Sequence, residues 1–248
     1  MSQSAKHEQR VAFFGGSFDP PHLGHLAVAR AALAALSLDK VLFAPVGTQP
    51  LKPAGSTASY EDRVEMTRLA IRADAAFEVS RTDAPKPGGK PNYTLETLLA
   101  VKNDLPQDCR LFCLMGADSF AGLQQWFRAA EIPFVAPLIV ASRPGQPLRD
   151  LEALLPKGLE LEQESATDST HPDAKAPAAA LRYYTLVNHA GQRAPFYALP
   201  DLDIPISASS IRERIRQELC EGGHLLAPGD ALLPAQVAEY IRAKGLYR

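Results

Sequence analysis

Residues 11–145 alternate between short apolar runs and stretches whose apolar positions recur at helical spacing. The apolar runs predict buried strands, and the stretches between them predict helices. Strands that alternate with helices are typical of an α/β protein with a doubly wound parallel sheet of the Rossmann-like type, covered by helices on both faces. The predicted strands are 11–14, 40–45, 77–80, 110–115 and 134–141, and the predicted helices are 26–36, a helix that starts at Ser59, 93–101 and 124–130.

The helix that starts at Ser59 has a clear N-terminal signal. Ser59 is a favourable N-cap residue, and Asp62 occupies the capping-box position three residues later. Val64, Ala70 and Ile71 are its predicted core positions.

The pattern becomes weaker between residues 146 and 199. Residues 146–161 predict no more than a short helix, and residues 163–180 are polar, rich in proline and alanine, and aperiodic. Such a composition is typical of a mobile loop or an insertion. Two short strands are predicted at 183–187 and 196–199, on either side of an exposed turn.

Helical order returns in the last part of the chain. Serines open a helix at about 206–219, and an amphipathic helix at 234–244 ends at Gly245 as its C-cap. We therefore expect one domain over 1–248, with a flexible leader at 1–10, an insertion-like and partly mobile region at 146–199, and a small C-terminal helical part at 206–248.

Composition limits the class of protein. The chain has 248 residues, 46% of them hydrophobic, which is enough to bury the core of one large domain. A net charge of −2 gives no electrostatic reason to bind nucleic acid or an anionic membrane. Because the sequence lacks an apolar run of about 18 residues and an apolar signal region, we expect a cytoplasmic protein without a membrane partner. The three cysteines are expected to be reduced thiols rather than metal ligands.

The stretch from Val11 to Leu26 reads VAFFGGSFDPPHLGHL and carries the clearest chemical signal. A strand, a glycine turn and a helix form the geometry in which α/β proteins bind phosphates, because backbone N–H groups and the helix N-terminus face the ligand. His22 and His25 share one helix face, and each can donate a hydrogen bond to a phosphate without a metal. The alternatives are two surface histidines or half of a zinc site, for which Asp19 is the one further ligand in the early chain.

A second candidate anion site begins at Ile206, where the sequence reads ISASSIR. Serine hydroxyls and free N–H groups at a helix start bind anions, and Arg212 adds a charge with the fork geometry that suits phosphate. Simple N-capping by Ser207 or Ser209 is the alternative.

These two stretches resemble the two signatures of the nucleotidylyltransferase superfamily, in which the histidines of His-x-Gly-His hold the triphosphate of ATP. Six blocks narrow the resemblance to the bacterial nicotinate-mononucleotide adenylyltransferases. In chain order they are FGGSFDPPHLGHL, YTLETL, GADSF with Trp126, LIVASRPG, ISASSIRERI and YIRAKGLYR. The resemblance implies adenylyl transfer from ATP to nicotinate mononucleotide, which gives nicotinate adenine dinucleotide and pyrophosphate in NAD biosynthesis.

The resemblance also implies roles for particular residues. The implied catalytic residues are His22, His25 and Arg212, and the implied ATP-binding residues are Gly15, Gly16, Ser17, Phe18, Gly24, Ser207 and Ser209. The implied mononucleotide-binding residues are Lys52, Thr94, Asp118, Trp126 and Arg143, with Trp126 on the pyridine ring and Asp118 near a ribose. The alternatives are a core aromatic for Trp126, a helix cap for Thr94 and a solvated charge for Arg143.

The implied chemistry suits these residue types. The attacking phosphate is already an anion at neutral pH, so catalysis rests on positioning and on stabilising charge at the α-phosphorus and the leaving pyrophosphate. Mg²⁺ is the implied cofactor, bound mainly through the phosphates of ATP, and no metal-ligating residue is predicted.

The sequence departs from the family pattern in the loop after the second strand. Leu51 stands where the family carries a histidine, and Lys52 keeps a charge that can reach a phosphate. The alternative functions are an adenylyltransferase or cytidylyltransferase for another acceptor, such as nicotinamide mononucleotide or phosphopantetheine, and a non-catalytic nucleotide sensor. The oligomeric state stays open, with a homo-oligomer among the possibilities.

Overall fold

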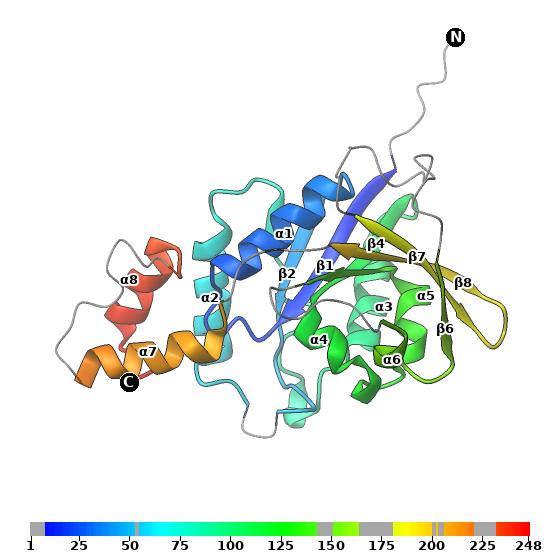
Figure 1. Cartoon of the computed structure of the whole chain (residues 1–248). Helices are drawn as coiled ribbons and strands as arrows, with labels where there is room; N and C mark the ends of the chain where they lie inside the picture. Colours follow the sequence, from blue (N-terminus) through cyan, green and yellow to red (C-terminus); the bar gives the residue numbers. More distant parts are fainter. Residues whose placement is uncertain are drawn as a thin grey trace, which may run out of the picture.

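The computed structural model describes residues 8–52, 55–142, 151–163, 181–199, 202, 206–220 and 232–248. The strands are β1 Gln9–Gly16, β2 Lys40–Pro45, β3 Phe77–Val79, β4 Cys109–Gly116, β5 Leu138–Ala141, β6 Leu159–Gln163, β7 Arg182–Asn188 and β8 Arg193–Leu199. They form one eight-stranded sheet in the order β3-β2-β1-β4-β5-β8-β7-β6 (Figure 1).

Helices occupy both faces of this sheet. They are α1 Leu23–Ala35, α2 Tyr60–Ile71, α3 Thr94–Asp104, α4 Ala117–Ala121, α5 Ile132–Val135, α6 Leu151–Leu154, α7 Ala208–Cys220 and α8 Ala235–Lys244. Short 3₁₀ turns lie at Pro87–Gly89, Leu123–Gln125 and Ala129–Glu131. In Figure 1, α7 and α8 lie at one end of the molecule, and α8 packs against α2.

The sheet is parallel over most of its width. The neighbours from β3 through β2, β1, β4 and β5 to β8 run parallel, which confirms the predicted α/β fold class. The prediction of a fully parallel sheet is wrong at the far edge, where β7 is antiparallel to β8 and to β6. Since a short turn joins β7 to β8, the two strands have to run antiparallel. The described part of 146–199 thus supplies three strands and α6.

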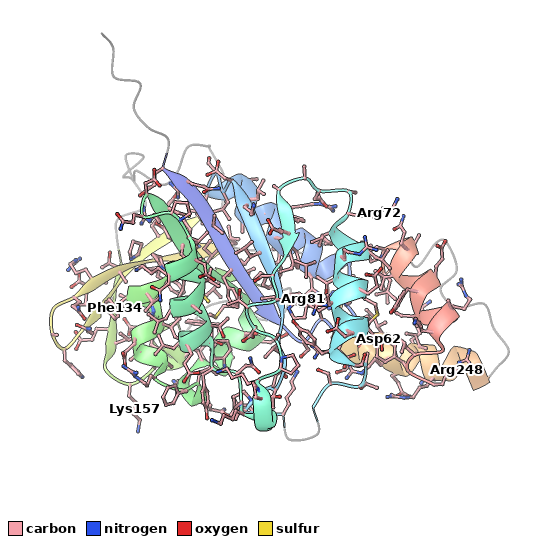
Figure 2. All side chains as sticks on the ribbon, turned by 180° about the vertical axis from the view of Figure 1, so that it is seen from behind. Asp62, Arg72, Arg81, Phe134, Lys157 and Arg248 are labelled. Atoms are coloured by element: carbon pink, nitrogen blue, oxygen red, sulfur yellow. The ribbon has the colours of Figure 1, made fainter. Side chains whose placement is uncertain are left out.

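Alternate residues of β1 point to opposite faces, as strand geometry requires. Ala12 and Phe14 belong to the core that α1, α2, α7 and α8 cover, whereas Val11 and Phe13 belong to the core beneath α3 and α5. Figure 2, viewed from behind, shows α3 lying on this second face. The residues of β1 are therefore buried on both sides, which explains the continuous apolar run in the sequence.

Several predicted elements match the structure closely. The strand at 40–45 has the predicted bounds, and Ser59 accepts a 3.1 Å hydrogen bond from the Asp62 backbone N–H as the N-cap of α2. Gly245 ends α8 in the left-handed conformation, with a φ of 63°. Among the described cysteines, Cys109 and Cys113 are free thiols, and burial raises the pKa of Cys113 to about 12.

Two predictions between β4 and β5 are wrong. The helix predicted at 124–130 is replaced by two 3₁₀ turns, because Trp126 is extended (φ −79°, ψ 149°) and Arg128 is left-handed (φ 51°). The strand predicted from Phe134 starts only at Leu138. Pro133 suits the first turn of α5, and Pro137 keeps the preceding residue out of the helical region.

The N-terminal part of the domain differs from the expectation. β1 begins at Gln9, inside the segment predicted as a flexible leader, and residues 1–7 lie outside the described residues. At the other end, Tyr247 is buried at 4% exposure in the core that also contains Ile211 of α7 and Val237 of α8.

The fold places a ligand crevice at one edge of the sheet. The chain leaves β1 toward β2 on one side, whereas β4 pairs with β1 on the other side. At such a switch point, the loops after neighbouring strands diverge and leave a crevice at the carboxyl ends. Gly16 lies level with Pro45 of β2, and Gly116 lies level with Ala141 of β5, so these strands end at the same edge.

Candidate active site

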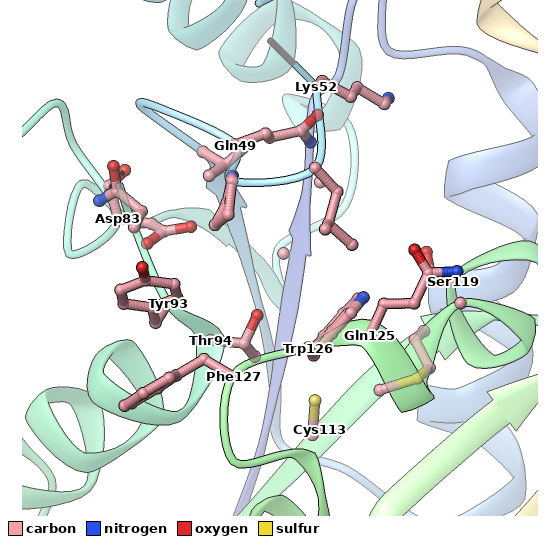
Figure 3. Close-up of a pocket in the computed structure, with 18 of the residues that line it drawn as sticks. Gln49, Lys52, Asp83, Tyr93, Thr94, Cys113, Ser119, Gln125, Trp126 and Phe127 are labelled. Carbon is pink, nitrogen blue, oxygen red and sulfur yellow. Dashed lines mark hydrogen bonds between the residues drawn. The ribbon is translucent and has the colours of Figure 1, made fainter. Parts of the chain in front are cut away.

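A cavity of about 580 Å³ opens at this edge (Figure 3). The end of β1, the loop after β2, the start of α3 and the segment after β4 enclose it. Its lining residues are Phe13, Gly15, Gly16, Val46, Gln49, Pro50, Leu51, Lys52, Asp83, Asn92, Tyr93, Thr94, Cys113, Leu114, Met115, Asp118, Ser119, Gly122, Gln125, Trp126 and Phe127. A mostly apolar wall with a few polar groups is typical of a small-molecule site.

The structure divides the predicted site residues into two groups. Gly15, Gly16, Lys52, Thr94, Asp118 and Trp126 line the cavity. Ser17, Phe18, His22, Gly24, His25, Ser207, Ser209 and Arg212 lie outside its lining. Arg143 lies outside the described residues.

The cavity receives aromatic side chains from two directions. Trp126 is half-buried, lines the cavity and packs against the core beneath α3 and α5, so it serves as a core aromatic and as a cavity wall. The rings of Tyr93 and Phe127 pack 4.6 Å apart at the same cavity. Figure 3 shows Trp126 and Thr94 facing the cavity from different elements. Tyr93, and not Thr94, is the N-cap residue of α3, which removes the cap alternative for Thr94.

His22 and His25 form a stacked pair at the start of α1. Their ring centroids lie 3.7 Å apart, and His22 is the N-cap residue with 1% exposure. The Nδ1 atom of His25 accepts a 3.1 Å hydrogen bond from the His22 backbone N–H. A ring nitrogen that accepts a hydrogen bond carries no proton, so the neutral imidazole has its proton on Nε2. In this tautomer His25 has one N–H donor, at Nε2.

Packing on both sides fixes the ring of His25. Phe18 and Phe14 contact it edge-on, with ring centroids 4.9 and 6.0 Å away. Phe18 itself is buried in a left-handed backbone conformation, with a φ of 47°. Bulky residues rarely adopt this conformation, so external contacts have to hold the turn between β1 and α1 in place.

Ser17 connects that turn to the cavity. Its Oγ accepts hydrogen bonds from Gln49 Nε2 at 2.8 Å and from Lys52 Nζ at 3.2 Å. Lys52 thus lies between the cavity and the turn between β1 and α1, which we call the histidine turn because it leads to His22 and His25. Leu51, which is 51% exposed, stands next to Lys52 and lacks the imidazole of the family pattern.

Arg63 holds the same turn from beneath, and sequence reasoning missed it. Its Nη1 donates to the Ser17 carbonyl at 2.7 Å, and its Nη2 donates to the Val46 carbonyl at 2.8 Å. Arg63 is 2% exposed, and burial lowers its pKa, although the nearby Asp19 opposes this shift. The available signal was its spacing of three and four residues from the buried Met66 and Thr67, which puts an arginine on the inner face of α2.

Asp19 connects the stretch that contains His22 and His25 to the second anion-site stretch, which begins at Ile206. Its backbone carbonyl accepts a 2.6 Å hydrogen bond from Arg212 Nη1. Arg212 also donates to Ser209 Oγ at 3.2 Å, so the guanidinium bridges α7 and the histidine turn. Ser207 Oγ accepts from the Ser210 backbone N–H at 3.1 Å, which is the N-capping contact that the simpler interpretation predicted.

Relatives in sequence identify the family. A family model described as cytidylyltransferase-like matches residues 13–214. A probable nicotinate-nucleotide adenylyltransferase of Gloeobacter violaceus is 36% identical over 239 residues, which cover 96% of each chain. One from Pelobacter propionicus is 33% identical over 243 residues, covering 96% of this chain and 98% of the relative. The chain belongs to the nicotinate-nucleotide adenylyltransferase family.

Solved structures support the fold of this family. The Plasmodium falciparum nicotinic acid mononucleotide adenylyltransferase complexed with NaAD superposes with a TM-score of 0.61, covering 96% of this chain and 97% of that chain. Its sequence identity to this chain is 13%, so the likeness concerns the fold. A structure from Vibrio parahaemolyticus has a TM-score of 0.53 at 16% identity, with 94% and 99% of the two chains covered.

Asp83 is a buried acid in the cavity wall of this family member, and it was not predicted. Thr97 Oγ1 donates a 2.6 Å hydrogen bond to its carboxylate, and burial raises the pKa of Asp83. Asn92 ties the neighbouring loops together, because its Nδ2 donates to the Ala84 carbonyl at 2.9 Å and its Oδ1 accepts from the Thr48 backbone N–H at 2.9 Å.

Within the described ranges, no group of three or more His, Cys, Asp or Glu side chains is placed to hold a metal ion. The same residues contain no helix that is long and apolar enough to cross a membrane.

Proposed function

We propose that this protein transfers the adenylyl group of ATP to nicotinate mononucleotide and releases pyrophosphate. The observation that carries the proposal is a cavity walled by Trp126 and Thr94 beside the turn between β1 and α1. His25 follows this turn at the start of α1, and Arg212 of α7 donates to its Asp19 carbonyl. A flat aromatic ring suits a pyridine ring by stacking, and the donors of the turn suit a polyphosphate.

The reaction follows from this arrangement. A phosphate oxygen of the mononucleotide attacks the α-phosphorus of ATP, a new P–O bond forms, and the bond to the β-phosphate oxygen breaks as pyrophosphate leaves. His25 Nε2–H donates to the phosphates where negative charge develops, and Arg212 holds the pyrophosphate with the N–H groups that do not bind Asp19 or Ser209. Lys52, at the border between the two substrates, offsets the charge of the attacking phosphate.

Mg²⁺ fits this site as a partner of ATP rather than of the protein. Both carboxylate oxygens of Asp19 accept hydrogen bonds from protein donors, so this buried carboxylate does not offer a free ligand. A Mg²⁺ ion keeps several waters and binds through substrate phosphates, where it neutralises charge. We propose that the ion enters the site with ATP.

The test is pyrophosphate release with ATP and Mg²⁺, compared for nicotinate mononucleotide, nicotinamide mononucleotide and phosphopantetheine. We expect the first to be used with the highest kcat/KM. Turnover with another acceptor alone would contradict the assigned substrate, and ATP binding without any pyrophosphate release would indicate a sensor.

The variant Trp126→Ala tests the assignment of the cavity. Since aromatic stacking on a base is worth about 1–3 kcal/mol, the KM for the mononucleotide is expected to rise by roughly five- to 150-fold, and more than the KM for ATP. Trp126→Phe keeps a stacking ring and serves as the control. An equal rise in the KM for both substrates in Trp126→Ala would contradict the placement of Trp126 against the pyridine ring.

A further inference from the structure

Tyr247, the penultimate residue, reaches the turn between β1 and α1. Its hydroxyl donates a 2.8 Å hydrogen bond to Asp19 Oδ1, across 228 positions of sequence. Both residues are buried, at 4% exposure for Tyr247 and 3% for Asp19. A contact between two buried polar groups so far apart in sequence needs an explanation beyond local chain geometry.

The backbone conformation of Tyr247 shows that the tail is held in this position. Its φ is 67°, in the left-handed region that aromatic residues rarely adopt. The tail turns back through Gly245, and Leu246 donates from its backbone to the Ile241 carbonyl at 3.1 Å. Burial and the neighbouring Asp19 raise the pKa of Tyr247, so the hydroxyl keeps the proton that it donates.

Asp19 connects Tyr247 to the residues that we propose bind phosphate. Its two carboxylate oxygens also accept from the backbone N–H groups of Thr57 at 2.6 Å and Ala58 at 3.1 Å, while its carbonyl accepts from Arg212. The side chain is thus anchored to the loop before α2 and to the tail, and the main chain of the same residue holds the guanidinium of α7.

We propose that Tyr247 is a positioning residue of the ATP site, which acts through Asp19 to hold the turn that carries His22, His25 and the acceptor of Arg212. The reaction itself rests on the proposed function, but the positioning of an ATP-binding turn does not depend on which acceptor is used. The C-terminal tail is therefore a part of the catalytic structure.

The experiment compares Tyr247→Phe with Tyr240→Phe. Each variant removes one hydroxyl that donates to a carboxylate from the C-terminal part of the chain. Tyr240 donates to Asp62 Oδ1 of α2 at 2.9 Å, so its hydroxyl binds α2 and not Asp19. The measurements are the Kd for a non-hydrolysable ATP analogue by calorimetry, the kinetic constants for both substrates, and the melting temperature.

For Tyr247→Phe we expect the Kd for the analogue to rise and the kcat/KM for ATP to fall, each by about five- to tenfold, with the KM for nicotinate mononucleotide changed by less than about twofold. Tyr240→Phe is expected to lower the melting temperature and to leave the ATP constants unchanged. If Tyr247→Phe leaves both ATP constants at the wild-type values, changes both substrates equally, or abolishes folding, the hydroxyl has a structural role alone and the proposal is wrong.

The two proposals fail in different ways. A wild-type protein that binds the ATP analogue but does not use nicotinate mononucleotide would contradict the proposed function. The comparison of the two tyrosine variants by calorimetry would still decide the role of Tyr247, because it requires no acceptor.

Discussion

His25 depends on a backbone amide for the proton state that its proposed role requires. The His22 N–H occupies Nδ1, and this contact places the proton of the neutral ring on Nε2. The pattern His-x-Gly-His predicts that the two rings lie together, but it does not tell which nitrogen of each ring carries the proton. That information comes from the cap geometry at the start of α1.

The variant His25→Asn distinguishes the role of Nδ1 from the role of Nε2. Asparagine keeps an acceptor near the position of Nδ1 and removes the Nε2 donor, so the helix start is expected to persist. We expect kcat to fall by about 10²–10³-fold, as for the loss of one donor to a developing charge. His189→Asn, in the exposed turn between β7 and β8, is the control. A kcat of His25→Asn close to that of the wild type would contradict the role of His25.

Asp83 makes the stability of the fold depend on pH. Its pKa is raised by burial, so the protonated form stabilises the folded state at low pH, and this contribution is lost as the pH rises through the folded-state pKa. Asp83→Asn keeps an acceptor for the Thr97 hydroxyl and carries no charge.

The melting temperature of Asp83→Asn is therefore expected to exceed that of the wild type at about pH 8, and the difference is expected to shrink toward about pH 4. Differential scanning fluorimetry across this range measures it. Glu160→Gln, which removes an exposed carboxylate on β6, is the control and should show no such trend. A constant difference at all pH values would show that Asp83 does not titrate in this range.

At the residue scale, the sequence predicts the residues of contiguous motifs and misses those that act through distant partners. Lys52, Thr94 and Trp126 were predicted from local blocks and line one cavity. Arg63 and Asp83 carry no motif, because the partner of Arg63 is the Ser17 carbonyl, 46 positions away, and the partner of Asp83 is Thr97, in the next helix of the chain. A single sequence shows the spacing of such residues but not the loops that fold against them.

At the element scale, the loop after β2 owes its position to Gly47. A Cβ atom at this position would lie 2.4 Å from the Pro85 backbone nitrogen, and the Gly47 N–H donates to the Asp83 carbonyl at 2.7 Å. The loop that carries Gln49 and Lys52 is thus packed against the backbone of the segment after β3, and no side chain fits between them.

Gly47→Ala is expected to lower the free energy of unfolding by about 1–3 kcal/mol, because the two backbones have to separate. The shift of the loop should also raise the KM for the mononucleotide. Urea unfolding monitored by circular dichroism gives the stability change. Gly116→Ala, whose Cβ would meet nothing within 4 Å, is the matched control. An equal free energy of unfolding for the two variants would show that the loop accommodates the added Cβ atom without a loss of stability.

The elements were predicted where local signals and packing agree. The Ser59 cap and the apolar run at 40–45 have the predicted bounds because capping and burial favour the same positions. The segment 124–130 was mispredicted because Trp126 turns toward the cavity and the core, and this tertiary contact overrides the helical propensity of the segment.

At the scale of the whole molecule, the strands after residue 181 share their core with the nucleotide-binding part. The ring of Phe196 packs on Phe120 at 5.4 Å, and the ring of Tyr197 packs on Phe112 at 6.0 Å. Phe196 is fully buried. We therefore expect β5, β7 and β8 to unfold together with β1 and β4 as one cooperative unit.

Phe196→Ala tests this expectation. The loss of a buried phenyl ring is expected to lower the free energy of unfolding by about 3–5 kcal/mol. Trp126 is the only tryptophan in the chain, so its fluorescence reports on the cavity and the core beside it, while circular dichroism reports on the whole fold. Both probes should shift to the same lower urea concentration. An unchanged fluorescence transition would show that the edge strands unfold independently.

The order of strands at the far edge was outside the reach of sequence reasoning. Tyr183–Val187 and Phe196–Leu199 were predicted as strands, but pairing in a sheet is a long-range choice that the alternation of apolar positions does not encode. The parallel centre was predicted because helices between strands leave few other topologies.

Ser17 has one further consequence for how the two substrates meet. Its single hydroxyl accepts from both Gln49 and Lys52, so two donors of the cavity loop are bound to one oxygen of the turn between β1 and α1. We expect an anion that draws Lys52 toward itself to loosen this shared contact and to change the turn at which we propose that ATP binds. Such a linkage is reciprocal: the factor by which the mononucleotide alters the affinity for ATP is also the factor by which ATP alters the affinity for the mononucleotide.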